Sequence, residues 1–185
     1  MERTTVTMDD HTDTLKTFTN GHKITLRTAI LPEDRERIRE IVESAGVFSP
    51  AEVDIALELA DQGVREGVRS GYHFLFAEIH GEVAGYTCYG PIPGTIGGFD
   101  LYWIAVKKNL RRVGLGTRLL EKTEFLIEES GGRRIYIETS SREQYHPARS
   151  FYEAHGYEKE AVLKDFYSPG DSKVIFVKKI ETPRS

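Results

Sequence analysis

The sequence of 185 residues contains a single cysteine, Cys88, which excludes an intrachain disulfide framework and a cysteine-rich zinc module. One free thiol is typical of a reducing compartment, so we expect a cytoplasmic location. No apolar run approaches the roughly 20 residues that a membrane-spanning helix needs. Residues 1–23 are rich in Thr, Asp and His and have no apolar stretch, so we expect neither a signal peptide nor a membrane anchor.

An excess of basic charge is also missing. The 25 Lys and Arg residues stand against 29 Asp and Glu residues, so we expect no uniformly basic surface and no nucleic-acid partner. The 6 histidines show no H-x-x-x-H or H-E-x-x-H spacing, and we expect no metal site. Hydrophobic residues make up 39% and charged residues 29%, which predicts a soluble globular chain.

The length fits one domain, which we expect over residues 23–181 after a flexible tail over residues 1–22. Alternating apolar residues predict strands near 23–27, 74–79, 83–89, 99–106, 134–139, 157–167 and 173–180. Helical spacing predicts helices that begin near residues 32, 50, 114 and 147. The order β-α-α-β-β-β-α-β-α-β-β, without an internal repeat, predicts a mixed α/β sheet in a single domain.

The most informative segment lies between a strong strand and a strong helix. It reads R-x-x-G-x-G and consists of Arg111, Arg112, Val113, Gly114, Leu115, Gly116 and Thr117. A helix start offers amide N–H groups without intrahelical partners, glycines allow close approach, and the arginines can add charge, so a pyrophosphate could bind here. The Walker and G-x-G-x-x-G patterns both fail. An ordinary strand-to-helix connection with solvated arginines is the alternative.

A second motif, Ala148-x-x-Phe151-Tyr152-Glu153-x-x-Gly156-Tyr157, follows later in the chain. Together the two motifs resemble the GNAT (Gcn-related) N-acetyltransferase superfamily, and the resemblance runs from about Ile24 to Ile180. Segments 85–91 and 100–106 are also similar to members associated with D-alanine–D-alanine ligase-like proteins. The resemblance implies an acyl-CoA N-acyltransferase fold, with a mixed, mostly antiparallel sheet flanked by helices in one domain.

The same resemblance implies acetyl-CoA as the acyl donor. Its pyrophosphate would occupy the turn at residues 111–117, near Phe151 and Tyr152, and its pantetheine arm would add along the strand edge at Ile104, Ala105 and Val106. Pantetheine amides can pair with a backbone edge as an added strand would, so apolar side chains at these positions are compatible with this arrangement.

Transfer to a primary amine by direct attack in a ternary complex needs a proton donor for the leaving thiolate and a base for the amine. Tyr152 aligns with the family's tyrosine and is our candidate acid; the alternative is a core aromatic residue. Asp100 is the first candidate base and Glu138 the second. Period two would put Asp100 on the same strand face as Tyr102 and Ile104. Asp100 could instead be an exposed residue at a strand start.

The acceptor amine is left open between small molecules, peptides and proteins. Tyr102, Tyr89 and Tyr167 are the candidate substrate contacts, and Tyr86, Trp103 and Phe166 add to a partly apolar pocket. We expect Cys88 to be a small buried residue and not an acyl carrier. A non-catalytic acyl-CoA-binding sensor or regulatory module is the alternative function, and the resemblance implies that a homodimer can form.

Overall fold

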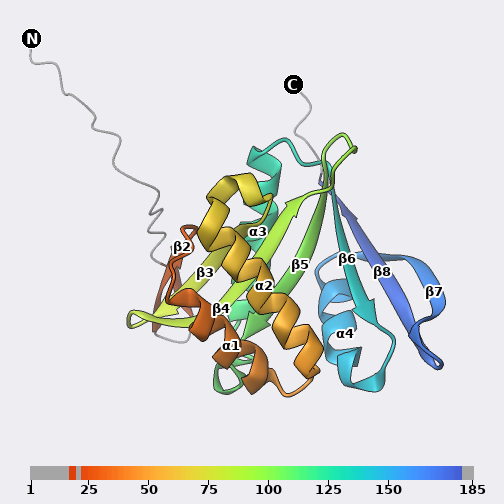
Figure 1. The fold of residues 1–185 in the computed structure, drawn as a ribbon, viewed down its shortest axis with the longest axis horizontal. Coiled ribbons are helices and arrows are strands. Elements are labelled where there is room, and N and C mark those ends of the chain that lie inside the picture. Colours follow the sequence, from red (N-terminus) through yellow and green to blue (C-terminus); the bar gives the residue numbers. More distant parts are fainter. Residues whose placement is uncertain (1–16, 20–21, 181–185) are drawn as a thin grey trace, which may run out of the picture.

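The computed structural model describes residues 17–19 and 22–180. Figure 1 shows one twisted sheet with helices against both of its faces. The strands are β1 (Thr17–Thr19), β2 (His22–Arg27), β3 (His73–Ile79), β4 (Glu82–Pro91), β5 (Gly98–Val106), β6 (Arg134–Ser140), β7 (Glu158–Ser168) and β8 (Asp171–Lys179). The helices are α1 (Asp34–Ala45), α2 (Pro50–Glu66), α3 (Leu115–Glu129) and α4 (His146–Ala154), with short 3-10 turns η1 (Gly67–Ser70), η2 (Lys108–Leu110) and η3 (Glu143–Tyr145).

The 8 strands follow the order β1-β2-β3-β4-β5-β6-β8-β7. All neighbouring pairs are antiparallel except β5 and β6, which are parallel. Helices α1 and α2 pack on one face of β3, β4 and β5, where their apolar side chains form one core cluster. Helices α3 and α4 cover the other face. The predicted mixed, mostly antiparallel sheet flanked by helices is confirmed.

Helix α2 begins where the sequence indicated. The Ser49 side chain accepts a hydrogen bond from the Glu52 amide, and the Glu52 carboxylate accepts one from the Ser49 amide, with Pro50 at the first helical position. This reciprocal capping box satisfies two amides that a helix start leaves without partners. In the described part of the chain, no helix has the length and apolar composition to cross a membrane.

The N-terminal edge differs from the expectation. Residues 17–19 form β1, antiparallel to β2, where we predicted part of a flexible tail. Thr and Phe favour extended backbone, and without β1 the outer edge of β2 would be unpaired. Three residues in β1 pair with part of that edge. Of the rest of the predicted tail, residues 1–16 and 20–21 lie outside the described residues, and His22 begins β2.

A β-bulge in β5 changes which side chains share a face. Cys88 pairs with Trp103 and Tyr89 with Leu101, so Tyr102 is the extra residue. Leu101 packs with the core on the α3 and α4 side, whereas Trp103 packs on the α1 and α2 side, two residues further on. Without the bulge these two side chains would lie on the same face.

The prediction that Asp100, Tyr102 and Ile104 share one strand face is therefore wrong for Ile104. Its side chain packs toward α3, in contact with the core clusters on that side. Asp100 and Tyr102 do lie on the same side of the sheet. A Cβ on Gly90, the partner of Asp100 in β4, would meet the Tyr102 ring at 3.3 Å.

Candidate functional site

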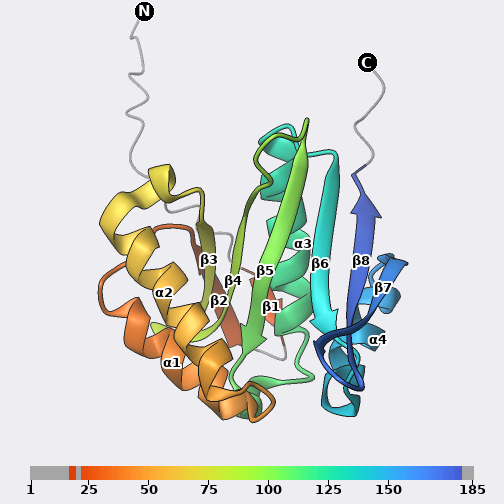
Figure 2. The same ribbon diagram turned by 45° about the vertical axis from the view of Figure 1, so that its right-hand side comes forward.

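An opening in the sheet lies between β5 and β6. The two strands pair at only three positions, the last of which joins Asp100 to Tyr136. Strand β5 then runs on to Val106 and β6 to Ser140 without further pairing between them, and Figure 2 shows the strands separating. The β5 backbone over residues 101–106 is thus an edge inside the sheet, to which an extended ligand with amide groups could add as a strand.

Strand β5 leads into the R-x-x-G-x-G turn. After η2, the backbone takes a left-handed conformation at Arg112 (φ 64°) and again at Gly114 (φ 82°), and α3 begins at Leu115. Gly114 is the N-cap, and no side chain caps the first turn. The amide N–H groups at this helix start are therefore open to an anion, and the helix dipole favours negative charge there.

Gly116 lies in the first turn of α3. A Cβ on this residue would meet only the Phe151 ring at 3.7 Å and Val106 at 4.0 Å, which are ordinary contact distances. Alanine would thus fit the protein, and glycine inside a helix costs about 1 kcal/mol relative to alanine. Packing therefore does not explain why this residue is glycine. Close approach of a ligand to the turn would explain it.

Arg111 lies elsewhere than predicted. Its guanidinium donates a hydrogen bond to the carbonyl oxygen of Ala45 at 3.3 Å, at the C-terminal end of α1. Helix C-termini attract cations, and the last turn of α1 has no basic side chain of its own. In this structure the Arg111 side chain therefore ties the turn to α1, and it is the backbone of residues 113–117 that is open to an anion.

Tyr152 of α4 packs where the opening meets the core. Its side chain is buried, with ring centroids 6.1 Å from Tyr157 and 5.8 Å from Phe176. Its cluster also includes Leu101 of β5 and Ile137 of β6, the strands that separate. Burial raises the pKa of the Tyr152 phenol well above its usual value, so the phenol keeps its proton at neutral pH. Among the described residues its hydroxyl has no hydrogen-bond partner.

Asp100 is the residue at which the pairing of β5 with β6 ends. Burial first, and then the nearby Glu138 carboxylate, raise the pKa of Asp100 to about 6, while Lys173 acts in the opposite direction. Glu138 forms an ion pair with Lys173 at 2.5 Å and is half exposed. Glu138 is thus paired directly with a cation, whereas Asp100 forms no ion pair with another described residue. Lys173, which sequence reasoning missed, carried no motif that would have indicated it.

Two of the three predicted substrate tyrosines lie beside these carboxylates. Burial, and then the Asp100 carboxylate, raise the pKa of Tyr102 to about 12, and its ring lies edge-on to Tyr72 at 5.4 Å. Burial, and then Glu138, Asp171 and Glu52 in that order, raise the pKa of Tyr167, whose side chain is half exposed. Tyr167 therefore faces acidic groups from three separate elements.

Other predicted aromatic contacts fall outside this group. Tyr89 is buried on the α3 and α4 face, opposite to Tyr102, because it pairs with Leu101 on the far side of the bulge. Tyr86 is 1% exposed in the core under α1 and α2, and its buried hydroxyl has no hydrogen-bond partner among the residues that the structure describes. The structure places both side chains in the core, and their role as pocket residues stays a prediction. Cys88 is fully buried, and burial raises the pKa of its thiol.

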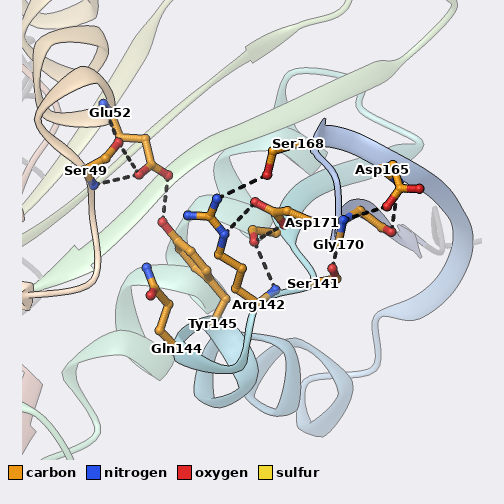
Figure 3. Close-up of polar contacts among 12 residues, drawn as sticks. Ser49, Glu52, Ser141, Arg142, Gln144, Tyr145, Asp165, Ser168, Gly170 and Asp171 are labelled. Carbon is orange, nitrogen blue, oxygen red and sulfur yellow. Dashed lines mark hydrogen bonds and ion pairs between the residues drawn. The ribbon is translucent and has the colours of Figure 1, made fainter.

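A polar network links the loop before α2 to the segment before α4 (Figure 3). The Tyr145 hydroxyl donates to Glu52 at 2.7 Å, and the Gln144 side chain donates to the carbonyl of Val47. Arg142 forms an ion pair with the buried Asp171 at 3.0 Å, which anchors the turn between β7 and β8. Only the capping box could be predicted from sequence, since the other partners lie far apart in the chain. Among the described residues, no group of three or more His, Cys, Asp or Glu side chains is arranged to hold a metal ion.

Comparison with known proteins identifies the family of this chain. The family model described as the acetyltransferase (GNAT) family matches residues 36–157, which include β5, the turn and α4. A solved structure of a GNAT-family acetyltransferase from Desulfovibrio desulfuricans superposes with a TM-score of 0.83 at 44% identity, covering 85% of this chain and 99% of that one. The resemblance predicted from the two motifs is confirmed.

Two curated relatives are similar over a shorter span. An uncharacterized N-acetyltransferase of Methanocaldococcus jannaschii is 34% identical over 57% of this chain and 65% of its own length. An N-alpha-acetyltransferase of Sulfolobus acidocaldarius is 28% identical over 55% of this chain and 65% of its own length. The chain thus spans just under two thirds of these relatives, whose shared class agrees with the predicted enzyme class.

Proposed function

Because this chain belongs to the acetyltransferase (GNAT) family, we propose that it transfers an acetyl group from acetyl-CoA to a primary amine. The observation that carries the proposal is the opening between β5 and β6, beyond the last pair at Asp100 and Tyr136. This opening joins three features: a free strand edge, an uncapped helix start at its end, and, in the adjoining core, a tyrosine hydroxyl that has no hydrogen-bond partner within residues 17–19 and 22–180. Acetyl-CoA supplies the thioester whose acetyl group is transferred.

The donor would be held mainly by backbone. The β5 edge at Ile104, Ala105 and Val106 offers peptide groups to the pantetheine amides, and the amides at the start of α3 offer donors to the pyrophosphate. Glycine at position 116 leaves this part of the turn without a side chain, next to the Phe151 ring, which a Cβ would meet at 3.7 Å. These groups orient the donor and need no charged side chain inside the sheet.

The carboxylates and the phenol divide the proton transfers. An amine arrives as an ammonium ion, which Asp100 and Glu138 attract, and Asp100 removes its proton directly or through a water molecule. A carboxylate with a pKa of about 6 is mostly ionised at pH 7, and a pKa this near to the working pH suits a group that removes a proton. Tyr152, which keeps its proton at neutral pH, donates to the sulfur as the thiolate leaves.

The acceptor is a primary amine of a small molecule, peptide or protein. Tyr102 and Tyr167 flank the carboxylates and would contact the acceptor body. The N-alpha-acetyltransferase relative makes a peptide α-amine one class to include. Direct transfer is favoured because the sole cysteine is buried with a raised thiol pKa. The homodimer and the cytoplasmic location stay predictions.

The experiment has two steps. Calorimetric titration of the purified protein with acetyl-CoA and with CoA tests donor binding, and mass spectrometry of a panel of amines and short peptides with acetyl-CoA tests transfer. We expect binding of both ligands and transfer to at least one amine. Absence of binding contradicts the proposal, whereas binding without transfer to any amine favours the acyl-CoA sensor.

A further inference from the structure

A histidine connects α4, which carries Tyr152, to the first turn of α3. His155 closes α4, and its imidazole lies between two oxygen atoms. Nδ1 is 2.7 Å from the carbonyl oxygen of Phe151, and Nε2 is 3.0 Å from the hydroxyl of Thr117 in the first turn of α3. The ring also contacts the Phe151 ring at a centroid distance of 4.2 Å. The side chain is thus held from two sides.

These contacts determine where the protons lie. A carbonyl oxygen only accepts hydrogen bonds, so Nδ1 must carry a hydrogen. In the neutral imidazole Nε2 is then an acceptor, and the Thr117 hydroxyl must donate its one proton to it. The Thr117 oxygen therefore has only lone pairs left to present in any other direction.

Those lone pairs are unfavourable to the ligand of this turn. Thr117 follows Gly116 at the helix start where, by the proposed function, the pyrophosphate of CoA binds, and phosphate oxygens at neutral pH are acceptors only. A protonated imidazole instead donates from both nitrogens, which releases the Thr117 proton toward the phosphate. The C-terminal end of α4 also favours a cation at His155.

We propose that His155 is a positioning residue for the donor, which takes up one proton from solvent when the pyrophosphate binds and so turns the Thr117 hydroxyl into a phosphate donor. In this step one N–H bond forms at Nε2 with a proton that solvent supplies, no bond between heavy atoms changes, and the Thr117 hydroxyl rotates away from Nε2. The inference rests on the proposed function, because it needs the pyrophosphate in this turn.

Charged neighbours do not account for such an uptake. Arg118 and Glu121 of α3 are paired with each other at 3.7 Å, and Arg149 donates to the carbonyls of Ser140 and Arg142. The remaining charged side chains within four positions of His155 in sequence are Glu153, Glu158 and Lys159. None of these side chains is hydrogen-bonded to the imidazole in the described part of the chain, because its two nitrogens contact Phe151 and Thr117.

Calorimetry in two buffers of different ionisation enthalpy tests the inference. The probe is 3′-dephospho-CoA, because its pyrophosphate does not titrate near neutral pH whereas the 3′-phosphate of CoA does. Between pH 6 and pH 8 we expect net proton uptake, with Kd rising by up to about tenfold per pH unit as the pH increases. His155→Gln should bind with no uptake and with a Kd that is independent of pH.

Matched variants separate this role from a purely structural one. Thr117→Ser keeps the hydroxyl and should keep the uptake, whereas Thr117→Val should lose most of it. His146→Gln, at the exposed opposite end of α4, should match the parent protein. Circular dichroism checks that each variant is folded. Binding without proton uptake by the parent protein overturns this inference and leaves the proposed function standing, whereas no binding at all overturns both.

Discussion

The two halves of the sheet are built differently. Strands β3, β4 and β5 are covered on both faces, by α1 and α2 on one side and α3 on the other, and most of their side chains are buried. Strands β6, β8 and β7 have α3 and α4 on one face only, and β7 leaves Val162 and Leu163 53% and 42% exposed. Figure 1 shows this asymmetry. The candidate catalytic residues lie at the boundary between β5 and β6, where the doubly covered half of the sheet ends. We call this boundary the seam.

Polar groups in the two regions differ in the same way. In the N-terminal half, the buried Asp34 accepts hydrogen bonds from Arg27, Arg37 and the Leu31 amide. At the seam, Asp100 lies near a like charge, and the Tyr152 hydroxyl has no hydrogen-bond partner in the part of the chain that the structure describes. A satisfied buried network stabilises the fold, whereas groups left without partners have capacity for a substrate.

The largest expected effect is at the seam. Tyr152→Phe should lower kcat by about 10²- to 10⁴-fold, the usual contribution of a general acid, with acetyl-CoA affinity and folding unchanged. Tyr86→Phe is the matched control, because it removes a buried, unpartnered hydroxyl from the other half and should leave kcat unchanged. Steady-state kinetics and calorimetry measure both. An unaltered kcat in Tyr152→Phe would make this residue a core aromatic only.

In the doubly covered half, Asp34→Ala should lower the free energy of unfolding by about 3–5 kcal/mol, because it leaves Arg27 buried without its bidentate partner. Burial opposes the charge of Asp34, but hydrogen bonds from Arg27 and Leu31 outweigh it and lower its pKa. This stabilisation is therefore present at neutral pH and is lost as the pH falls below about 4. Urea unfolding at pH 7 and pH 3 measures it. A similar loss at both pH values would contradict the ionic origin.

Asp100→Asn should reduce kcat/KM by about 10²-fold at pH 7.5, since it removes the base without changing the size of the side chain. The parent enzyme needs Asp100 ionised, so its kcat/KM should fall about tenfold per pH unit below the pKa of about 6 and level off above it. The variant should lose this dependence. If Glu138→Gln gave the larger loss and the altered profile, the base would be Glu138.

The smallest effect separates ligand binding from stability. Gly116→Ala should raise the free energy of unfolding by about 1 kcal/mol and weaken CoA binding by about tenfold, because alanine suits the helix but obstructs the turn. Gly63→Ala in α2 is the matched control: its Cβ would meet Phe74 at 2.5 Å, so it should lower stability and leave CoA affinity unchanged. Thermal unfolding and calorimetry give both quantities. Unchanged CoA affinity in Gly116→Ala would place the pyrophosphate elsewhere.

Local signals predicted much of this molecule. Pro50 after Ser49 indicated the start of α2, and the glycine-rich turn before Leu115 indicated that of α3. These elements depend on caps and periodicity, which act within a few residues. The face of Ile104 could not be predicted, because the extra residue Tyr102 is defined only by its pairing partner in β4. The contact of Arg111 with α1 could not be predicted for a similar reason, since its acceptor Ala45 lies 66 positions away.

The sequence by itself determined the order of the elements from β2 to β8, the family and the open helix start, because short-range backbone chemistry decides where strands end and helices begin. Tertiary structure decided where β5 parts from β6, which carboxylate is neutralised, and that His155 holds the Thr117 hydroxyl. Each of these depends on a partner far away in the chain. Only packing brings those partners close enough for hydrogen bonds and charge interactions. Those interactions set the protonation of the candidate catalytic groups.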